Sequence, residues 1–296
     1  MLSRIRGKAR SPLAAVAAVV LAGAALLSVT GCAAGAAGTA TGKEKHMTSQ
    51  PRAAATASLT ADLAAAARAR VFFGHQSVGM NILDGVPGVY AAHGMPAPLI
   101  EEGATRPGES GGFIDHVYIG ENEYPMLKVK DFAAALRSGL GQRVSVAMMK
   151  FCFVDVTSGT DVSALFRTYQ DTMTALQREF PKVTFVAVTV PLTTEPGLLS
   201  RVKSKLTGSS GAAADNVARQ RLNALIRQHY TGGHLFDLAA IESTAPDGTR
   251  VTGSYDGQRY YALYDGYASD EGHLNATGAR IVATAWLQAI ARAAGK

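Results

Sequence analysis

Short apolar runs alternate with segments of helical periodicity along most of the chain. The runs predict buried strands at residues 70–73, 97–101, 144–149, 183–190 and 234–238. Apolar residues recur at helical spacing between them, over 78–93, 131–139, 162–180, 216–230 and 276–294, and an Ala-rich helix precedes them from residue 59. Short buried strands separated by helices indicate βαβ units. We therefore expect an α/β fold, with a mainly parallel sheet of about five strands and helices on both faces.

Two long segments show neither the apolar runs of buried strands nor the periodicity of helices. Residues 103–131 are rich in glycine and charge, and residues 243–269 carry a group of tyrosines. Loops of such length in a compact domain are usually functional or mobile. We expect both to be irregular and to lie near a site.

The N-terminus has the pattern of an export signal. A basic start precedes an apolar run over residues 12–29, and Val29-Thr30-Gly31-Cys32 resembles a bacterial lipobox. That resemblance implies cleavage before Cys32 and acylation of its thiol. The alternative is an uncleaved signal anchor, because the apolar run approaches spanning length. Residues 32–58 are mostly small and polar, which predicts a flexible tether between the signal (1–31) and a folded domain (59–296).

Charge and cysteine content limit the possible partners. Removing residues 1–31 takes away four cations and no acids, which lowers the formal net charge from +6 to +2. No basic stripe remains, so we expect no nucleic-acid partner. Cys152 is then the remaining cysteine and excludes an internal disulfide. It is interpreted as a small buried hydrophobe, with a nucleophilic thiol as the alternative.

No cofactor or metal is expected. The chain has no Walker or Rossmann glycine pattern. His229 and His234 lack carboxylates or cysteines at metal-ligand spacing.

Two distant segments carry the chemistry of a serine hydrolase. Asp270 stands three residues before His273 at the start of the last helix, so its carboxylate can bind the Nδ1–H and leave Nε2 to accept a proton. Ser77 follows the first strand in a turn between Gly74 and Gly79. A hydroxyl needs such a base to become a nucleophile. Ser77 could instead be a helix N-cap, and Glu271 could replace Asp270.

These two segments resemble the SGNH/GDSL-type hydrolases over residues 68–296, in a divergent form. In that family a nucleophilic serine follows the first strand and an Asp-x-x-His block precedes the last helix, which implies the roles of Ser77, Asp270 and His273. The resemblance also implies a flavodoxin-like doubly wound sheet. The order Ser, Asp, His and the flanking glycines are similar to the nucleophile turn of α/β-hydrolases as well, although that serine follows several strands.

The chain departs from the family in its other blocks. His75-Gln76-Ser77 replaces Gly-Asp-Ser, and Lys150-Phe151-Cys152-Phe153-Val154-Asp155 replaces Gly-x-Asn-Asp after the third strand. We expect the oxyanion hole to comprise the N–H groups of Ser77 and Gly120 with the Asn122 amide. Gly103, Gly111 and Gly112 are alternatives to Gly120 as donor. Lys150 and Asp155 are candidates to replace the missing Gly-x-Asn-Asp block. His75 is expected to support the turn or to bind substrate.

The sequence thus predicts an ester hydrolase held at the bacterial cell envelope by lipid on Cys32, on the extracytoplasmic side. Its expected substrate is an acylated carbohydrate, another small-molecule ester or a lipid. Two alternatives remain: an acyltransferase with the same triad, and a non-catalytic binding lipoprotein on the same scaffold.

Overall fold

The computed structural model describes residues 50–103, 111–197 and 211–295. These residues fall within one compact unit, Thr48–Lys296. The predicted signal, its cleavage point at Cys32 and most of the predicted tether lie outside the described residues. Residues 50–58, which the sequence assigns to the tether, belong to the first helix.

Helices and strands alternate from this first helix onward. The main sheet contains β1 (Arg70–His75), β2 (Leu99–Glu102), β3 (Phe113–Tyr118), β4 (Val146–Met149), β5 (Thr184–Val188) and β6 (Leu235–Phe236). The α-helices are α1 (Gln50–Arg68), α2 (Val78–Ala92), α3 (Pro125–Arg137), α4 (Val162–Glu179), α6 (Gly211–His229), α7 (Leu238–Glu242) and α8 (Ala276–Ala293). Short 3-10 turns are η1 (Leu140–Gln142), η2 (Phe153–Asp155), η3 (Gly232–His234) and η4 (Asp265–Tyr267).

The sheet order is β2-β3-β1-β4-β5-β6, with every pairing parallel. This confirms the predicted fold class, because β3-β1-β4-β5-β6 has the doubly wound order of a flavodoxin-like sheet. The predicted second strand is β2, an additional strand at the edge. The strand beside β1 is β3, inside the segment that we expected to be a loop. Its apolar run is interrupted by Asp115 and His116, which are nevertheless both buried.

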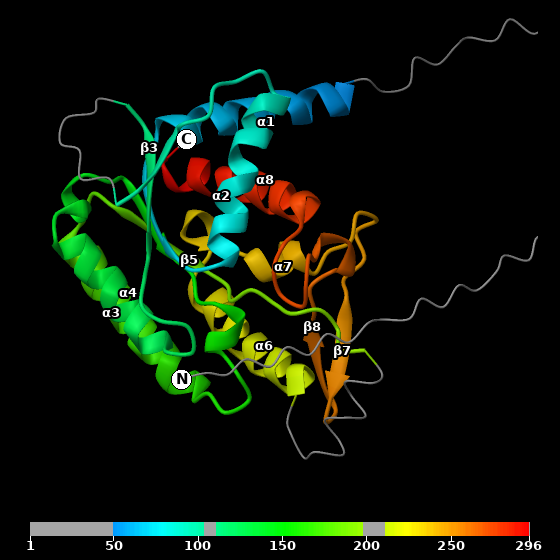
Figure 1. The fold of residues 1–296 in the computed structure, drawn as a ribbon. Coiled ribbons are helices and arrows are strands. Elements are labelled where there is room, and N and C mark those ends of the chain that lie inside the picture. Colours follow the sequence, from blue (N-terminus) through cyan, green and yellow to red (C-terminus); the bar gives the residue numbers. More distant parts are fainter. Residues whose placement is uncertain (1–49, 104–110, 198–210, 296) are drawn as a thin grey trace, which may run out of the picture. The chain divides into compact units, whose positions relative to one another are not determined.

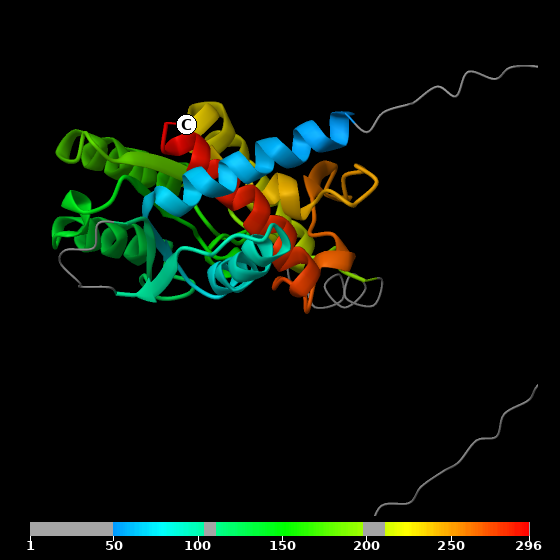
Figure 2. The ribbon, with the colours of Figure 1, turned by 90° about the horizontal axis from the view of Figure 1, so that it is seen from above.

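Successive residues of the strands face opposite sides of the sheet, as the pleat requires. In β4, Val146 and Met148 pack into one core while Ala147 and Met149 pack into the other. The first core lies under α1, α2, α7 and α8, and the second lies under α3, α4 and α6. Figures 1 and 2 show these two groups of helices on either side of the sheet. Both faces of the strands are therefore covered, which explains their continuous apolar runs.

We expected the segment 243–269 to be irregular, and this is wrong for part of it. It contains an antiparallel hairpin of β7 (Thr252–Tyr255) and β8 (Gln258–Tyr261), turning at Asp256 and Gly257, which both have positive φ. Asp-Gly favours such a turn. The tyrosines that obscured this pattern include Tyr260, which is buried, and Tyr261, whose ring lies 3.8 Å from the Arg250 guanidinium.

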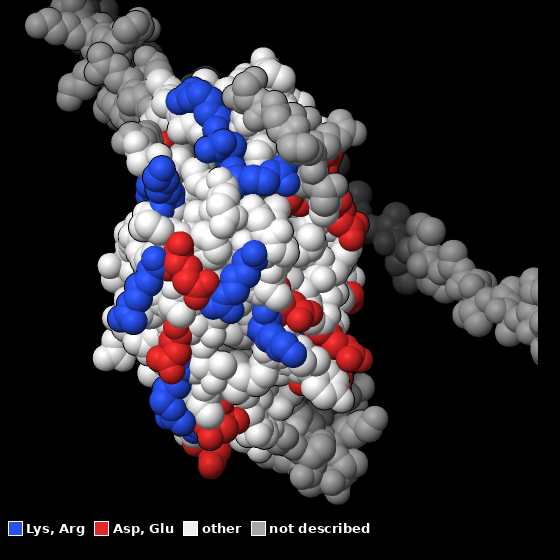
Figure 3. All heavy atoms as spheres, turned by 90° about the vertical axis from the view of Figure 1, so that its left-hand side faces the viewer, with Lys and Arg blue, Asp and Glu red and all other residues white. Residues whose placement is uncertain are grey.

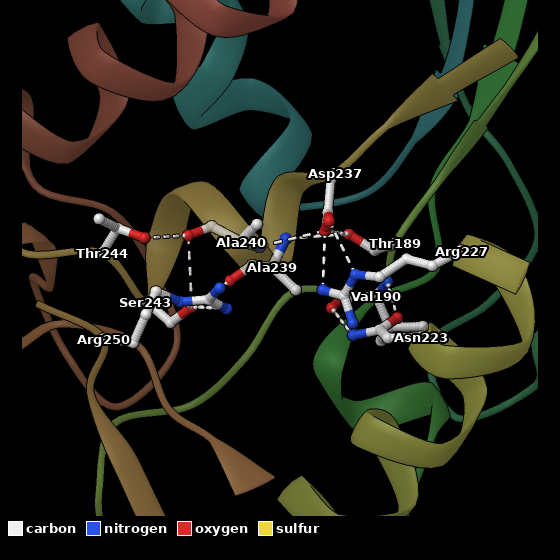
Figure 4. A network of polar contacts seen from close by, with 10 residues as sticks. All are labelled: Thr189, Val190, Asn223, Arg227, Asp237, Ala239, Ala240, Ser243, Thr244 and Arg250. Carbon is white, nitrogen blue, oxygen red and sulfur yellow. Dashed lines mark hydrogen bonds and ion pairs between the residues drawn. The ribbon is translucent and has the colours of Figure 1, made fainter. Parts of the chain in front are cut away.

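A polar network fixes the chain where it leaves β5 and β6 (Figure 4). Arg227 of α6 makes two hydrogen bonds, of 2.7 and 2.8 Å, to the Asp237 carboxylate. Asn223 binds both the N–H and the carbonyl of Val190, and Arg250 donates twice to the Ser243 hydroxyl. These contacts satisfy backbone and side-chain groups near the end of β5 and hold α6 and α7 against the sheet.

The face formed largely by α3 and α4 carries basic and acidic side chains interspersed (Figure 3). Arg137 and Glu179 form a bidentate ion pair there, at 2.6 and 2.7 Å. Since the pair is well exposed, solvent screens it and it contributes little to stability. In the part of the chain that is described, no helix has the length and apolar character needed to cross a membrane.

Candidate active site

Ser77 stands in a strained turn directly after β1. Its φ of 23° and ψ of −89° lie outside the regions that a residue with a Cβ favours, and its side chain makes no capping hydrogen bond to α2. The alternative interpretation of Ser77 as an N-cap therefore finds no support in the geometry. Strain at a side chain that caps nothing is typical of functional residues.

The Ser77 turn leaves a backbone donor available. The Gly79 and Met80 N–H groups bind the carbonyls of Gln76 and Ser77, but the Ser77 N–H has no acceptor among the described residues. It lies at the carboxyl end of β1, where the ligand crevice of such a sheet is found.

His273 and Asp270 form a close pair. The Nδ1 atom of His273 lies 2.8 Å from Asp270 Oδ2 and 3.0 Å from Oδ1. Asp270 Oδ1 also accepts hydrogen bonds from the backbone N–H groups of Gly272 and His273. These bonds lower the pKa of the Asp270 carboxyl, and the bond from Gly272 has the larger effect. An ionised Asp270 holds the proton on Nδ1, which leaves Nε2 as the acceptor. Glu271, the alternative partner, instead accepts the Thr194 N–H through its backbone carbonyl.

Three contacts connect this pair to the Ser77 turn. Asn81, one turn along α2 from Ser77, accepts the N–H of Leu274 through its amide oxygen at 3.1 Å. Phe153 packs its ring edge-on against the imidazole of His273, with centroids 5.5 Å apart, and its neighbour Cys152 lies 4.0 Å, Sγ to Oγ, from Ser77. In the described chain no hydrogen bond joins Ser77 to His273. Such bonds are often long without substrate.

Cys152, in the run that stands in place of a Gly-x-Asn-Asp block, lies beside Ser77. Its N–H donates to Asp155 Oδ2 at 2.6 Å, and its sulfur lies 3.5 Å from the Nζ of Lys150. Lys150 is fully buried, and this burial lowers the pKa of its ammonium. We interpreted Cys152 from its apolar neighbours as a small buried hydrophobe. Its burial fits this interpretation, while its contact with Ser77 depends on the pairing of β1 with β4.

The structure gives Gly120 and Asn122 partners of their own. Gly120 follows β3 with a φ of 55°, but its N–H donates to Asp131 Oδ2 at 2.9 Å. Asn122 is exposed, and its amide oxygen accepts from Lys128, which also binds Asp155 at 2.6 Å. The Gly120 N–H could serve an oxyanion only after leaving this carboxylate. We therefore do not retain it as a donor.

A side chain that we had not singled out ties this loop to the nucleophile turn. Gln76, next to Ser77, donates through its amide nitrogen to the carbonyls of Ile119 and Gly120, at 3.2 and 3.1 Å. The only signal in the sequence was its place in the His75-Gln76-Ser77 run, which replaces the family pattern.

The competing glycines lie elsewhere. Gly111 and Gly112 precede β3, so they lie at the amino ends of the strands, away from the carboxyl ends where Ser77 is found. A Cβ on Gly112 would meet the backbone of α1 at Ala67, so this glycine serves packing. The Gly103 N–H donates to the His116 carbonyl.

His75 supports the turn. It is fully buried, its Nε2 lies 3.1 Å from His116 Nδ1, and a Cβ on Gly79 would collide with its ring. Burial, followed by the Lys150 and His116 charges, lowers the pKa of His75 to about 3. The ring is therefore neutral at physiological pH.

A cavity of about 410 Å³ is lined by Glu271, the neighbour of Asp270 in the chain, and by Phe153, whose ring contacts His273. It is bordered by Phe153 and Asp155 after β4, by Glu271, and by Asp215 and Arg219 of α6. Among the described residues, no group of three or more His, Cys, Asp and Glu side chains is placed to hold a metal ion.

Comparisons with known proteins return distant structural similarities only. No family model matches the chain, and no curated protein matches it. A protein from Streptococcus pneumonia, described in terms of platelet activating factor, is similar over 80% of this chain and 97% of its own, at 12% identity and a TM-score of 0.44.

Two further solved structures are similar at lower scores. One, from Desulfitobacterium hafniense, is assigned to lipolytic proteins of the G-D-S-L family and aligns over 75% of this chain and 99% of its own (8% identity, TM-score 0.39). The other is the catalytic domain of the Streptococcus pneumoniae peptidoglycan O-acetyltransferase OatA, with a methylsulfonyl adduct, over 74% and 91% (10% identity, TM-score 0.35). We rest no functional claim on similarities at these scores.

Proposed function

We propose that this chain is an ester hydrolase in which Ser77 is the nucleophile, His273 the general base and Asp270 the group that orients it. Ser77 Oγ attacks the ester carbonyl carbon while His273 Nε2 takes its proton. The tetrahedral intermediate collapses, and the leaving alcohol takes that proton from His273. Water, activated by the same imidazole, then attacks the acyl-enzyme, which releases the acid and frees Ser77.

One observation carries this proposal: the imidazole of His273 is held by Asp270 at 2.8 Å beside a turn that keeps Ser77 at a φ of 23°. A purely structural Asp–His pair has no need of a strained serine nearby. A non-catalytic binding protein likewise has no need of all three groups.

The developing oxyanion requires donors that point at it without rearrangement. The Ser77 N–H is the first, because it has no acceptor among the described residues. The Asn122 amide remains our proposed second donor, since its oxygen accepts from Lys128 while its NH2 group donates to no acceptor among the described residues. Asn122→Ala should then lower kcat by about 10²–10³ with little change in KM. A rise in KM at constant kcat would make Asn122 a substrate-binding residue.

The exposure of the pair favours hydrolysis over acyl transfer. The side chains of His273 and Asp270 are 35% and 55% exposed, so water reaches the base freely. A transferase has to exclude water from its acyl-enzyme until the acceptor is bound. We propose that the acyl group is carried by a carbohydrate or another small alcohol, and that lipid on Cys32 holds the enzyme at the cell envelope.

Turnover of p-nitrophenyl acetate by the chain from residue 50 onward tests the proposal. Wild type should release nitrophenol, and Ser77→Ala and His273→Ala should each lose several orders of magnitude in kcat. Cys152→Ala is the matched control for the neighbouring thiol and should retain turnover. Activity that survives in Ser77→Ala but is lost in Cys152→Ala would assign the nucleophile to the cysteine instead.

A further inference from the structure

The cavity of about 410 Å³ is polar and lies one side chain away from His273. Phe153 borders it and also contacts the His273 ring, and Glu271 borders it next to Asp270 in the chain. Its volume falls within the range of about 300–1,000 Å³ that is typical of small-molecule sites. A substrate whose ester lies at Ser77 and His273 could therefore extend into this space.

Arg219 is the cavity's principal donor. It is only 3% exposed, and its Nε donates to the Phe153 carbonyl while Nη1 donates to Thr193 Oγ1 and Asn216 Oδ1. Among the described residues Nη2 binds no acceptor, which leaves N–H groups of a fixed guanidinium for a ligand. Burial lowers the pKa of Arg219 to about 10, so the group is still charged at neutral pH.

The other charged residues of the lining are acidic. Asp215, Glu271 and Glu123 border the cavity, whereas the charge of Asp155 is offset by Lys128 at 2.6 Å. One guanidinium thus faces three carboxylates, and the net charge repels a phosphate or carboxylate. Three threonines, Thr157, Thr160 and Thr193, add hydroxyls to the lining, and its apolar part comes from Pro125, Val154 and Ala212 beside Phe153.

We infer that the cavity binds the alcohol portion of the ester as a polyhydroxylated ring, a neutral or amine-bearing sugar, and excludes anionic esters. Carboxylates and a guanidinium are the groups that accept from and donate to neighbouring sugar hydroxyls. The Arg219 guanidinium lies over the Phe153 ring, 5.9 Å from its centroid, so its position in the cavity wall is fixed. This inference rests on the proposed function for its chemistry, but the binding itself does not require Ser77.

Two esters that differ by one group provide the test: mono-acetylated glucose and mono-acetylated glucose phosphate. Wild type should have a kcat/KM for the neutral ester at least about tenfold above that for the phosphorylated one. Asp215→Lys, which reverses a charge in the cavity, should bring the two values within about threefold of each other. Asp171→Lys makes the same change on the exposed surface of α4 and should leave the ratio unaltered. A ratio near one in wild type, or a ratio that Asp215→Lys does not move, overturns the inference.

Binding to Ser77→Ala separates this inference from the proposed function. Calorimetry should detect the neutral sugar ester and not its phosphate. Binding by Ser77→Ala without ester turnover by wild type would support the cavity and refute the hydrolase. Turnover of p-nitrophenyl acetate without sugar binding would support the hydrolase and refute the sugar site in the cavity. If Asp215→Lys does not fold, Asp215→Asn keeps an acceptor for the Ser158 N–H, removes the charge, and should also narrow the ratio.

Discussion

The strain at Ser77 predicts that removing the nucleophile's side chain entirely will stabilise the protein. A residue with a Cβ at a φ of 23° and ψ of −89° costs about 1–3 kcal/mol, which glycine does not incur. Against this gain, glycine loses more conformational entropy on folding, which destabilises the folded state by about 0.5–1 kcal/mol. The serine hydroxyl offers little in return, because its one hydrogen-bonding contact within the described residues is with the Cys152 sulfur at 4.0 Å. Ser77→Gly should therefore gain about 1 kcal/mol, whereas Ser77→Ala keeps the strain and should be near wild type.

Urea unfolding of wild type, Ser77→Ala and Ser77→Gly measures this difference, and both variants should be inactive. In a domain of this size the gain corresponds to about 2–4 °C in Tm. Asp256→Gly is the matched control: its φ is also positive, at 49°, but in a hairpin turn that Asp tolerates, so its gain should be smaller. Ser77→Gly no more stable than Ser77→Ala would refute the idea that strain is stored at this serine.

Further predictions concern the base and a buried acid. Asp270→Asn should cut kcat by about 10⁴ while binding is kept, because the amide no longer fixes the His273 tautomer; equal kcat would remove Asp270 from the mechanism. Asn81→Ala, which strands the Leu274 N–H, should lower kcat and cost about 1 kcal/mol in urea unfolding, whereas Asn81→Asp keeps the acceptor and should restore both. Burial raises the pKa of Glu242 from 4.5 to about 8, so the folded state retains a proton that the unfolded state releases. The stability of wild type relative to Glu242→Gln should thus fall by about 1.4 kcal/mol per pH unit between about pH 4.5 and 8; a flat difference would contradict the shift.

The sequence revealed the fold wherever strands are continuously apolar. The runs at 144–149 and 183–190 are buried on both faces, so they were recognisable as β4 and β5. Strand β3 escaped because Asp115 and His116 stand inside it, and a buried polar pair cannot be distinguished from a loop by periodicity. The hairpin at 252–261 escaped because most of its residues are exposed and its tyrosines show no alternation.

Some residues of the candidate site were also predictable from local sequence, whereas others depend on contacts between distant segments. Asp270 and His273 are close in the chain, so their pairing followed from spacing and helix position alone. The place of Cys152 beside Ser77 depends on the register of β1 with β4, which no local pattern encodes. Gly120 stands after the strand that the resemblance requires, yet its N–H is bound by Asp131, eleven residues along the chain in α3. Side-chain competition for a backbone donor of this kind is visible only in three dimensions.

The central claim is that Ser77 is a nucleophile activated by His273, and covalent labelling tests it most directly. The chain is incubated with a fluorophosphonate, digested, and the modified residue located by mass spectrometry. One phosphonate should form on Ser77, rapidly in wild type and not in His273→Ala. A phosphonate elsewhere, or labelling of Ser77 that is equally fast without His273, would contradict the central claim.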